Sequence, residues 1–226
     1  MLIQGQVGAQ NNGDGVTSAS IRQGKQGELI ASELHGRFYE QAYRGNLFSA
    51  GTTAVTALSA NTITTSATTT PIVGVYNPVG SGVNVVVLQA SLQAFINTLT
   101  TPVGAGAFQW AYSLNNPAIS TGATPTNRFL GGTASKTKAF NGGVALTGLT
   151  NALTVLEGAD FTSPTGQTYG TIVAPTTGTT MTGFGGVQNI DGSIVVPPGG
   201  VLALLNTTST TTMSTVARLL WEEVPV

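Results

Sequence analysis

The hydrophobic positions of this chain fall in short runs that turn residues separate, which is the pattern of β-strands. The strongest run covers residues 83–95 (VNVVVLQASLQAF) and is long enough to bend partway along. Phe and Trp alternate with polar or small residues in 108–112 (FQWAY), as expected for a strand with one buried face. The other predicted strands cover 72–76, 145–149, 153–156, 168–173, 193–196, 201–205 and 215–224.

Turn residues lie between these runs. Gly80-Ser81-Gly82 separates the first two predicted strands, and Pro197-Pro198-Gly199-Gly200 makes a tight break later in the chain. Eight or nine short strands without a helical period predict an all-β fold, a β-sandwich with a jelly roll as the preferred form. The Thr-rich segments 52–70 and 176–182 fit either meandering edge strands or long loops.

Charge divides the chain into two parts. Eight of the charged residues lie among the first 44, so we predict an N-terminal arm (1–44) and a β-sandwich body (45–226). Residues 1–27 are rich in Gly, Gln, Asn and Ser and are expected to be extended or disordered on their own. Residues 28–48 fit a helix, with apolar side chains at i, i+4 spacing, and also an extended strand. The extended form is slightly preferred, because Gly36 weakens a helix by about 1 kcal/mol relative to Ala.

The body is poor in charge. Only 8% of residues are charged, against roughly a quarter in an ordinary soluble domain, and residues 45–127 contain no Asp, Glu, Lys, Arg or His. Polar residues interrupt every apolar run before the roughly 18 residues that a spanning helix needs, so no membrane segment is predicted. Low charge favours association, and interface centres are depleted in charge. These properties indicate a structural subunit that assembles with copies of itself, rather than an enzyme.

Candidate chemistry is sparse. The net charge of −1 argues against nucleic-acid binding, and the lack of cysteine excludes disulfides and thiolate sites. His35 is the only histidine, so a Ser–His–acid triad would have to use it, and we interpret it as an interface residue. Glu157 and Asp160 fit a solvated turn better than a calcium site, and Asp191 fits a turn. No catalytic, cofactor or metal site is predicted.

Two further motifs have ordinary explanations. The loop 131–137 (GGTASKT) has the look of a phosphate loop, but Ser135 stands where that loop has Gly, and no strand-to-helix transition follows. The aromatic residues of the predicted strands could stack on a sugar ring but are better explained as core; they are Phe108, Trp110, Tyr112 and Trp221.

Three segments carry a resemblance to a known class of proteins. They are ELHGRFYEQAYRGNLFSAGTTA (33–54), PIVGVYNPVGSGVNVVVLQAS (71–91), and NIDGSIVVPPGGVLALLNTTS (189–209) with the C-terminal LLWEEVPV. Together they resemble virion structural proteins of tailed bacteriophages. The resemblance implies a β-sandwich subunit on or within a phage particle and leaves its position in the particle open.

These observations lead to an expected function. The chain is expected to be a capsid decoration or cement protein, a homo-oligomer with a trimer as the preferred form, located in the virion after assembly in the host cytoplasm. Its expected partners are further copies of itself, the major capsid protein and other virion proteins. The arm is expected to bind these partners through Leu34, His35, Arg37, Phe38, Tyr39, Tyr43 and Arg44. The alternative is a collar, tail-fibre or receptor-binding protein that contacts host glycan.

Overall fold

The computed structural model describes residues 5–7, 21–23, 36–52, 56–58, 68–96, 108–119, 122–141, 146–159, 161, 169–173, 180–206 and 210–226. The chain divides into two compact units, Met1–Glu40 and Gln41–Val226. In the first unit, β1 (Gly5–Val7) pairs in parallel with β2 (Ile21–Gln23). The second unit, here called the body, contains the two large sheets.

The described part contains one helix, α1 (Tyr39–Tyr43), and is otherwise built of strands. The strands of the body are β3 (Leu47–Gly51), β4 (Thr56–Leu58), β5 (Thr68–Thr69), β6 (Val73–Tyr76), β7 (Val83–Ile96), β8 (Phe108–Ser113), β9 (Thr126–Asn127), β10 (Lys138–Asn141), β11 (Leu146–Thr147), β12 (Thr154–Gly158), β13 (Tyr169–Val173), β14 (Thr180–Val196), β15 (Val201–Asn206) and β16 (Thr210–Pro225).

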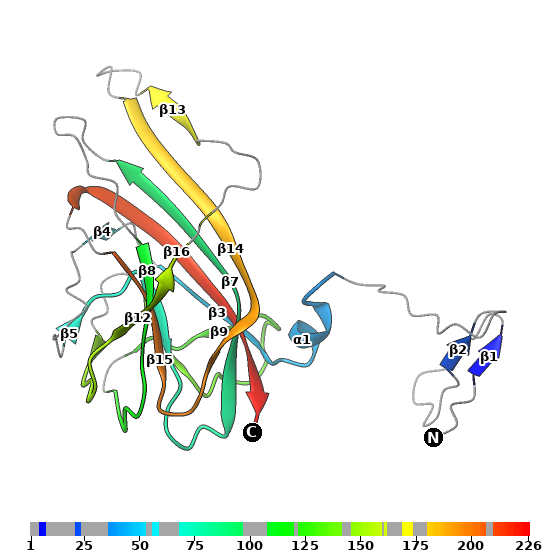
Figure 1. The fold of residues 1–226 in the computed structure, drawn as a ribbon. Coiled ribbons are helices and arrows are strands. Elements are labelled where there is room, and N and C mark those ends of the chain that lie inside the picture. Colours follow the sequence, from blue (N-terminus) through cyan, green and yellow to red (C-terminus); the bar gives the residue numbers. More distant parts are fainter. Residues whose placement is uncertain are drawn as a thin grey trace. The chain divides into compact units, whose positions relative to one another are not determined.

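The body is a β-sandwich, as the sequence predicts (Figure 1). One sheet has five strands in the order β10-β6-β15-β8-β12, and its pairings are antiparallel. The other has seven strands in the order β13-β14-β7-β16-β3-β9, with β4 also paired to β16. The long strands β7, β14 and β16 lie next to one another in this sheet. The jelly-roll connectivity stays a prediction.

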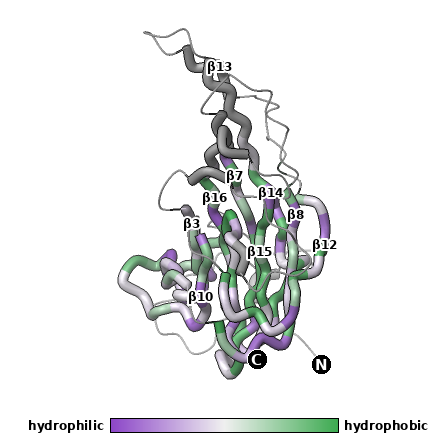
Figure 2. Tube along the Cα trace, turned by 90° about the vertical axis from the view of Figure 1, so that its left-hand side faces the viewer, coloured by the Kyte–Doolittle hydropathy of each residue, from purple (hydrophilic) through white to green (hydrophobic). Residues whose placement is uncertain are grey.

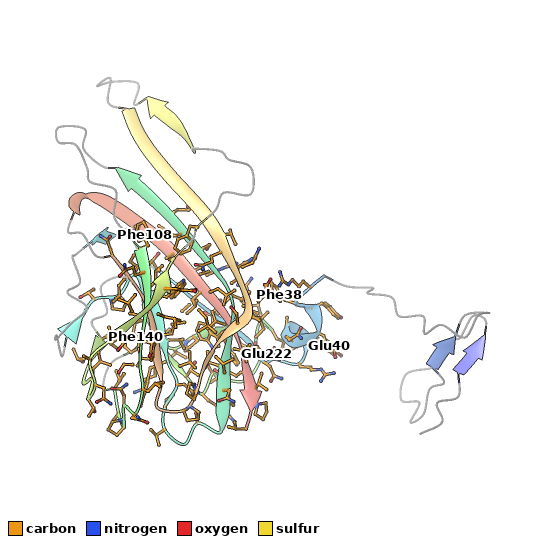
Figure 3. All side chains as sticks on the ribbon, in the orientation of Figure 1. Phe38, Glu40, Phe108, Phe140 and Glu222 are labelled. Atoms are coloured by element: carbon orange, nitrogen blue, oxygen red, sulfur yellow. The ribbon has the colours of Figure 1, made fainter. Side chains whose placement is uncertain are left out.

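The main core lies between the two sheets. Trp110 of β8 and Leu202 and Leu204 of β15 pack in one cluster with Leu92 of β7 and Trp221 of β16. Figure 3 shows side chains filling the body. The Trp110 indole N–H donates a 2.9 Å hydrogen bond to the Gln188 side chain of β14, which joins the two sheets. Core packing of this kind explains the alternating pattern of the long strands.

A second core covers the other face of the five-stranded sheet. It contains Tyr76, Phe140, Leu153, Val201 and further apolar side chains of the same sheet and its loops. Because this sheet is buried on both faces, all six residues of β15 are buried and its sequence, VLALLN, does not alternate.

The long strands bend at a shared irregularity. The register of β7 shifts between Val87 and Gln89 against both β14 and β16, so the predicted bend of 83–95 falls here. On β14 the insertion contains Asp191 and Gly192, with φ angles of 53° and 82°. The predicted turn at Asp191 is therefore a bulge inside a strand.

The predicted break at 197–200 is a tight turn that closes one end of the sandwich. Gly199 has φ of 80°, and the Gly200 N–H donates to the Pro197 carbonyl at 2.9 Å. The neighbouring turn is tied to it, because the Gly199 N–H donates to the Asn77 carbonyl at 2.7 Å. The Asn77 side-chain amide also donates to the carbonyls of Val83 (2.7 Å) and Val196 (3.0 Å).

Several predictions are corrected. The extended form preferred for residues 28–48 is wrong over α1, where the backbone is helical; residues 28–35 lie outside the described part. Strands β3 and β10 were not predicted, because each is short and is stabilised by distant partners, β16 and β6. Of the Thr-rich segments, 56–58, 68–69 and 180–182 belong to strands. The predicted arm (1–44) extends slightly past the first unit, and its role stays a prediction.

Candidate functional site

An exposed cluster of apolar side chains lies beside the edge of the seven-stranded sheet formed by β3 and β9. Tyr43 is 64% exposed, Phe129 47% and Leu130 86%. The rings of Tyr43 and Phe129 meet edge to face with centroids 6.4 Å apart. We call Tyr43, Phe129 and Leu130 the Tyr43 patch. Exposed aromatic residues held against one another are typical of protein-binding hot spots.

Asn127 holds the patch together. Its side-chain amide donates 2.9 Å hydrogen bonds to the carbonyls of Gly45, next to α1, and of Thr133. Its side-chain oxygen accepts a 2.9 Å hydrogen bond from the Phe129 N–H. The Arg128 N–H donates to the Leu47 carbonyl at 2.8 Å, which fixes the start of the loop to β3. The patch is therefore organised before any partner arrives.

A tight turn presents Leu130 at its tip. The Gly132 N–H donates to the Phe129 carbonyl at 2.9 Å, and Gly131 has φ of 88° at the third position of the turn, as a type II turn requires. A Cβ at Gly132 would lie 2.8 Å from the Asn127 amide nitrogen and 2.9 Å from the Phe129 carbonyl. The two glycines thus allow the turn to close around Asn127.

Charged groups surround the patch. Arg44 and Arg128 are both exposed. Burial lowers the pKa of Arg218, and the neighbouring Arg128 lowers it further. Burial raises the pKa of Glu222, while Arg44 acts in the opposite direction. The Arg218 guanidinium donates a 3.0 Å hydrogen bond to the Gln89 side chain on β7.

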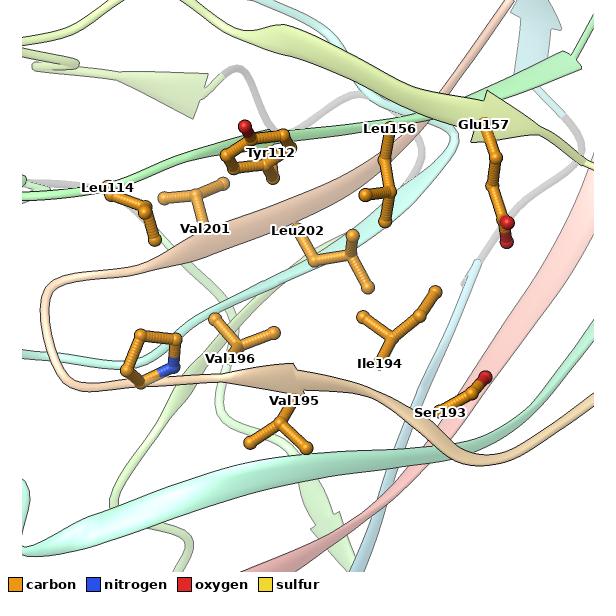
Figure 4. Close-up of a pocket in the computed structure, with 11 residues that line it drawn as sticks. Tyr112, Leu114, Leu156, Glu157, Ser193, Ile194, Val195, Val196, Val201 and Leu202 are labelled. Carbon is orange, nitrogen blue, oxygen red and sulfur yellow. The ribbon is translucent and has the colours of Figure 1, made fainter.

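A pocket of about 410 Å³ lies between the two sheets at the other edge of the sandwich (Figure 4). Apolar side chains dominate its lining, and two of them are exposed: Leu114 is 41% and Leu156 44% exposed. The described lining residues are Tyr112, Leu114, Leu156, Glu157, Ser193, Ile194, Val195, Val196, Pro197, Val201 and Leu202. We call this the inter-sheet pocket. It is suited to apolar side chains, and Glu157 is the one charged residue among its described lining residues.

The loop that follows the patch binds a carboxylate of its own chain. Glu223 of β16 is 5% exposed and accepts hydrogen bonds from the Ser135 hydroxyl, the Thr137 hydroxyl (3.2 Å) and the Lys136 N–H (3.1 Å). The loop 131–137, which has the look of a phosphate loop in sequence, therefore closes over the Glu223 side chain of its own chain. This arrangement anchors the loop to β16.

The predicted arm residues are only partly described. Leu34 and His35 lie outside the described residues. The Arg37 guanidinium lies 5.2 Å from the centroid of the Phe38 ring, a cation–π contact between chain neighbours, and Tyr39 is 44% exposed. Figure 3 labels Phe38 in the first unit. Tyr43 and Arg44 belong to the body, and Tyr43 meets Phe129.

From the sequence alone, Phe129 and Leu130 are not identified as candidate site residues. They follow the charge-free stretch in an Arg-Phe-Leu-Gly-Gly segment, and two large apolar residues directly before a Gly-Gly pair are a turn signal that could have identified them. The aromatic residues interpreted as core are confirmed: Trp110 and Trp221 are fully buried, and Phe108 and Tyr112 pack against the core. Glu157 lies in the edge strand β12 rather than in the predicted turn, and Asp160 lies outside the described residues.

Across the described ranges, no group of three or more His, Cys, Asp or Glu side chains could hold a metal ion. None of the helices in the same ranges is long and apolar enough to cross a membrane. The described residues thus form two surfaces suited to non-covalent binding, the aromatic Tyr43 patch and the apolar inter-sheet pocket. No family model, curated protein or solved structure matches the chain.

Proposed function

We propose that this chain is a non-enzymatic structural subunit of a phage particle that decorates and stabilises the capsid. The observation that carries the proposal is the Tyr43 patch, a preorganised and exposed aromatic cluster on a charge-poor β-sandwich. Rigid aromatic side chains that need no reordering bind at low entropic cost. In this proposal the body associates with further copies, in a trimer as the preferred form, and the N-terminal arm attaches the assembly to the major capsid protein.

The described residues support binding more than catalysis. The buried side chain of Glu223 accepts hydrogen bonds from the loop 135–137 and anchors it. Many symmetric copies on a capsid would turn a weak contact into lasting attachment, so each arm needs only modest affinity for the capsid. For the glycan-binding alternative, Trp110 and Trp221 are buried and unavailable for stacking on sugar, so the exposed rings of Tyr43 and Phe129 would have to serve.

The test is binding to capsids of the phage that encodes the chain, prepared without this protein. The full chain should co-sediment with the capsids, and a chain lacking residues 1–40 should not, although it keeps a β-type circular dichroism spectrum. A matched deletion of residues 1–27 should keep most binding, because the apolar part of the arm begins at Glu28. Undiminished attachment after deletion of residues 1–40 would show that the arm is not the attachment device.

A further inference from the structure

The Tyr43 patch and the inter-sheet pocket lie at opposite edges of the seven-stranded sheet. The patch sits beside β3 and β9, and the pocket is lined by the end of β14. Strands β7, β16 and β3 separate β14 from β9, so the two edges are about 19 Å apart at the usual strand spacing. Figure 2 shows β3 on one side of the body and β12 and β14 on the other. Neither surface can therefore cover the other within one copy.

The two surfaces have complementary shapes. The patch projects, with Leu130 at the tip of a closed turn and Phe129 behind it. The pocket is concave and apolar, and its volume of about 410 Å³ is large enough to admit whole side chains. Burial of exposed apolar area on both sides is the main favourable term in such a contact.

Their charges are complementary too. Arg128 lies directly before Phe129, and no Lys, Arg or His occurs between residues 139 and 217, which contain every pocket strand except β8. The pocket has Glu157 in its lining, and Asp191 lies two residues before Ser193 on the same strand. Conversely, the sequence around the patch lacks acidic residues: no Asp or Glu occurs between residues 45 and 156, which contain Phe129, Leu130 and the rest of their loop. The projecting patch is thus flanked by arginine, and the pocket is flanked by carboxylates, so the two surfaces carry charges of opposite sign.

The strands beside the pocket do not favour an added β-strand; they are the edge strand β12 and the part of β14 beyond its pairing with β13. Strand β12 has a register shift between Val155 and Glu157, and β14 has a larger one between Asn189 and Ile194. Bulges of this kind protect edges against strand pairing. The pocket is therefore suited to inserted side chains rather than to an added strand.

We propose that the Tyr43 patch of one copy docks into the inter-sheet pocket of a second copy, with Leu130 and Phe129 as the inserted side chains. The contact deepens the proposed function, on which it rests, by naming the self-association surface. Because the two surfaces differ, the contact is heterologous: each copy uses its patch on one neighbour and its pocket on another. Repetition of such a contact closes a ring or extends a filament, and a trimer is one of the closed forms.

The test uses the purified full-length chain and its solution mass by light scattering and sedimentation. The wild type should form multimers of the 22.9 kDa chain. Leu130→Glu in the patch and Leu156→Glu in the pocket should each weaken association by more than about 100-fold, because a carboxylate would be buried without a partner. Val79→Glu is the matched control: Val79 is 61% exposed in the turn between β6 and β7, outside both surfaces, and should assemble like the wild type.

Mixing the two interface variants is the decisive step. Leu130→Glu keeps an intact pocket and Leu156→Glu keeps an intact patch, so an equimolar mixture should give dimers that grow no further. A two-fold interface made by one surface would not show this complementation. Leu114→Glu, at a second pocket position, replaces Leu156→Glu if that variant fails to fold.

The remaining outcomes overturn the proposal. A wild type that stays monomeric, or variants that assemble like the wild type, would exclude this interface. Loss of assembly in Leu156→Glu but not in Leu130→Glu would mean that another segment occupies the pocket. No capsid is present in this test, so a failure here concerns self-association only. Attachment to the capsid is tested separately by the co-sedimentation experiment.

Discussion

At the residue scale, single polar side chains connect segments that are far apart in the chain. Asn127 joins the turn at Gly132 to Gly45, 82 residues away, and Glu223 holds the loop at Ser135 and Thr137. A buried carboxylate is stable only when it has such partners. These contacts position the loop that carries the Tyr43 patch, so they link packing to the proposed binding surface.

Glu223→Ala should lower the free energy of unfolding by roughly 1–3 kcal/mol, because the Ser135 and Thr137 hydroxyls and the Lys136 N–H lose their acceptor. Urea unfolding followed by tryptophan fluorescence measures this. Lys136→Ala is the control: it keeps the N–H, and the Lys136 side chain is exposed, so stability should change by less than about 0.5 kcal/mol. An equal loss in both variants would contradict the anchoring role of the carboxylate.

Glu222→Gln should remove part of the pH dependence of stability. Burial raises the pKa of Glu222 in the folded chain, so the folded state binds its proton more readily than the unfolded state. Its contribution to stability is therefore fully present below about pH 4.3, the usual pKa of Glu, and is lost as the pH rises through the folded pKa. Between acid and neutral pH, the urea midpoint of unfolding should fall less for the variant than for the wild type. Parallel profiles would rule out this assignment.

At the element scale, the pattern of apolar and polar residues along a strand depends on whether one or both of its faces are buried. Strand β15 is buried on both faces and is apolar throughout, whereas β12 is exposed at all five positions and includes Val155 and Leu156. Leu156 of this edge strand lines the inter-sheet pocket, which a second copy fills in the proposed contact. The turn between β14 and β15 carries the chain from one sheet to the other, so its geometry determines how the sandwich closes.

Gly199→Ala should destabilise the body by about 1–2 kcal/mol, because Gly199 has φ of 80° and L-residues are strained in that region. The new Cβ would also lie 3.2 Å from the Val79 side chain. Gly158→Ala is the matched control, since a Cβ there meets no atom within 4 Å. Thermal unfolding of both variants checks the difference; equal melting temperatures would show that the turn tolerates a side chain.

At the scale of the whole molecule, charge is segregated between two edges of the body. Arg128 lies at the patch edge, and Glu157 lies at the pocket edge. Segregation of this kind sets register and orientation more than affinity. Head-to-tail association of copies would bring the two edges together.

Charge reversal should therefore show rescue between copies. Arg128→Glu and Glu157→Arg should each weaken self-association by about 3- to 10-fold, the range expected for a partly exposed ion pair. An equimolar mixture of the two should recover association, because each patch then meets a pocket of opposite charge. Sedimentation at low and high salt measures both effects, and salt should reduce them. A mixture as weak as either variant alone would exclude this pairing.

The sequence by itself determined the fold class, most strand positions and the buried aromatic residues. Period-two alternation and Gly- and Pro-rich turns are local signals, so residues 72–76, 83–95 and 201–205 could be assigned to strands without knowledge of their partners. The helical form of α1 was missed because its apolar spacing also fits a strand. Five residues are too few for local propensity to decide between the two.

Only the tertiary structure decided the surfaces. The contact of Tyr43 with Phe129, the cradle around Glu223 and the pocket between β12 and β14 all depend on which distant strands become neighbours. The same limit applies to β3 and β10, which are strands because they pair with β16 and β6. Local sequence carries no direct record of such long-range pairing, because strand order is selected by the burial of the whole core rather than by any one segment.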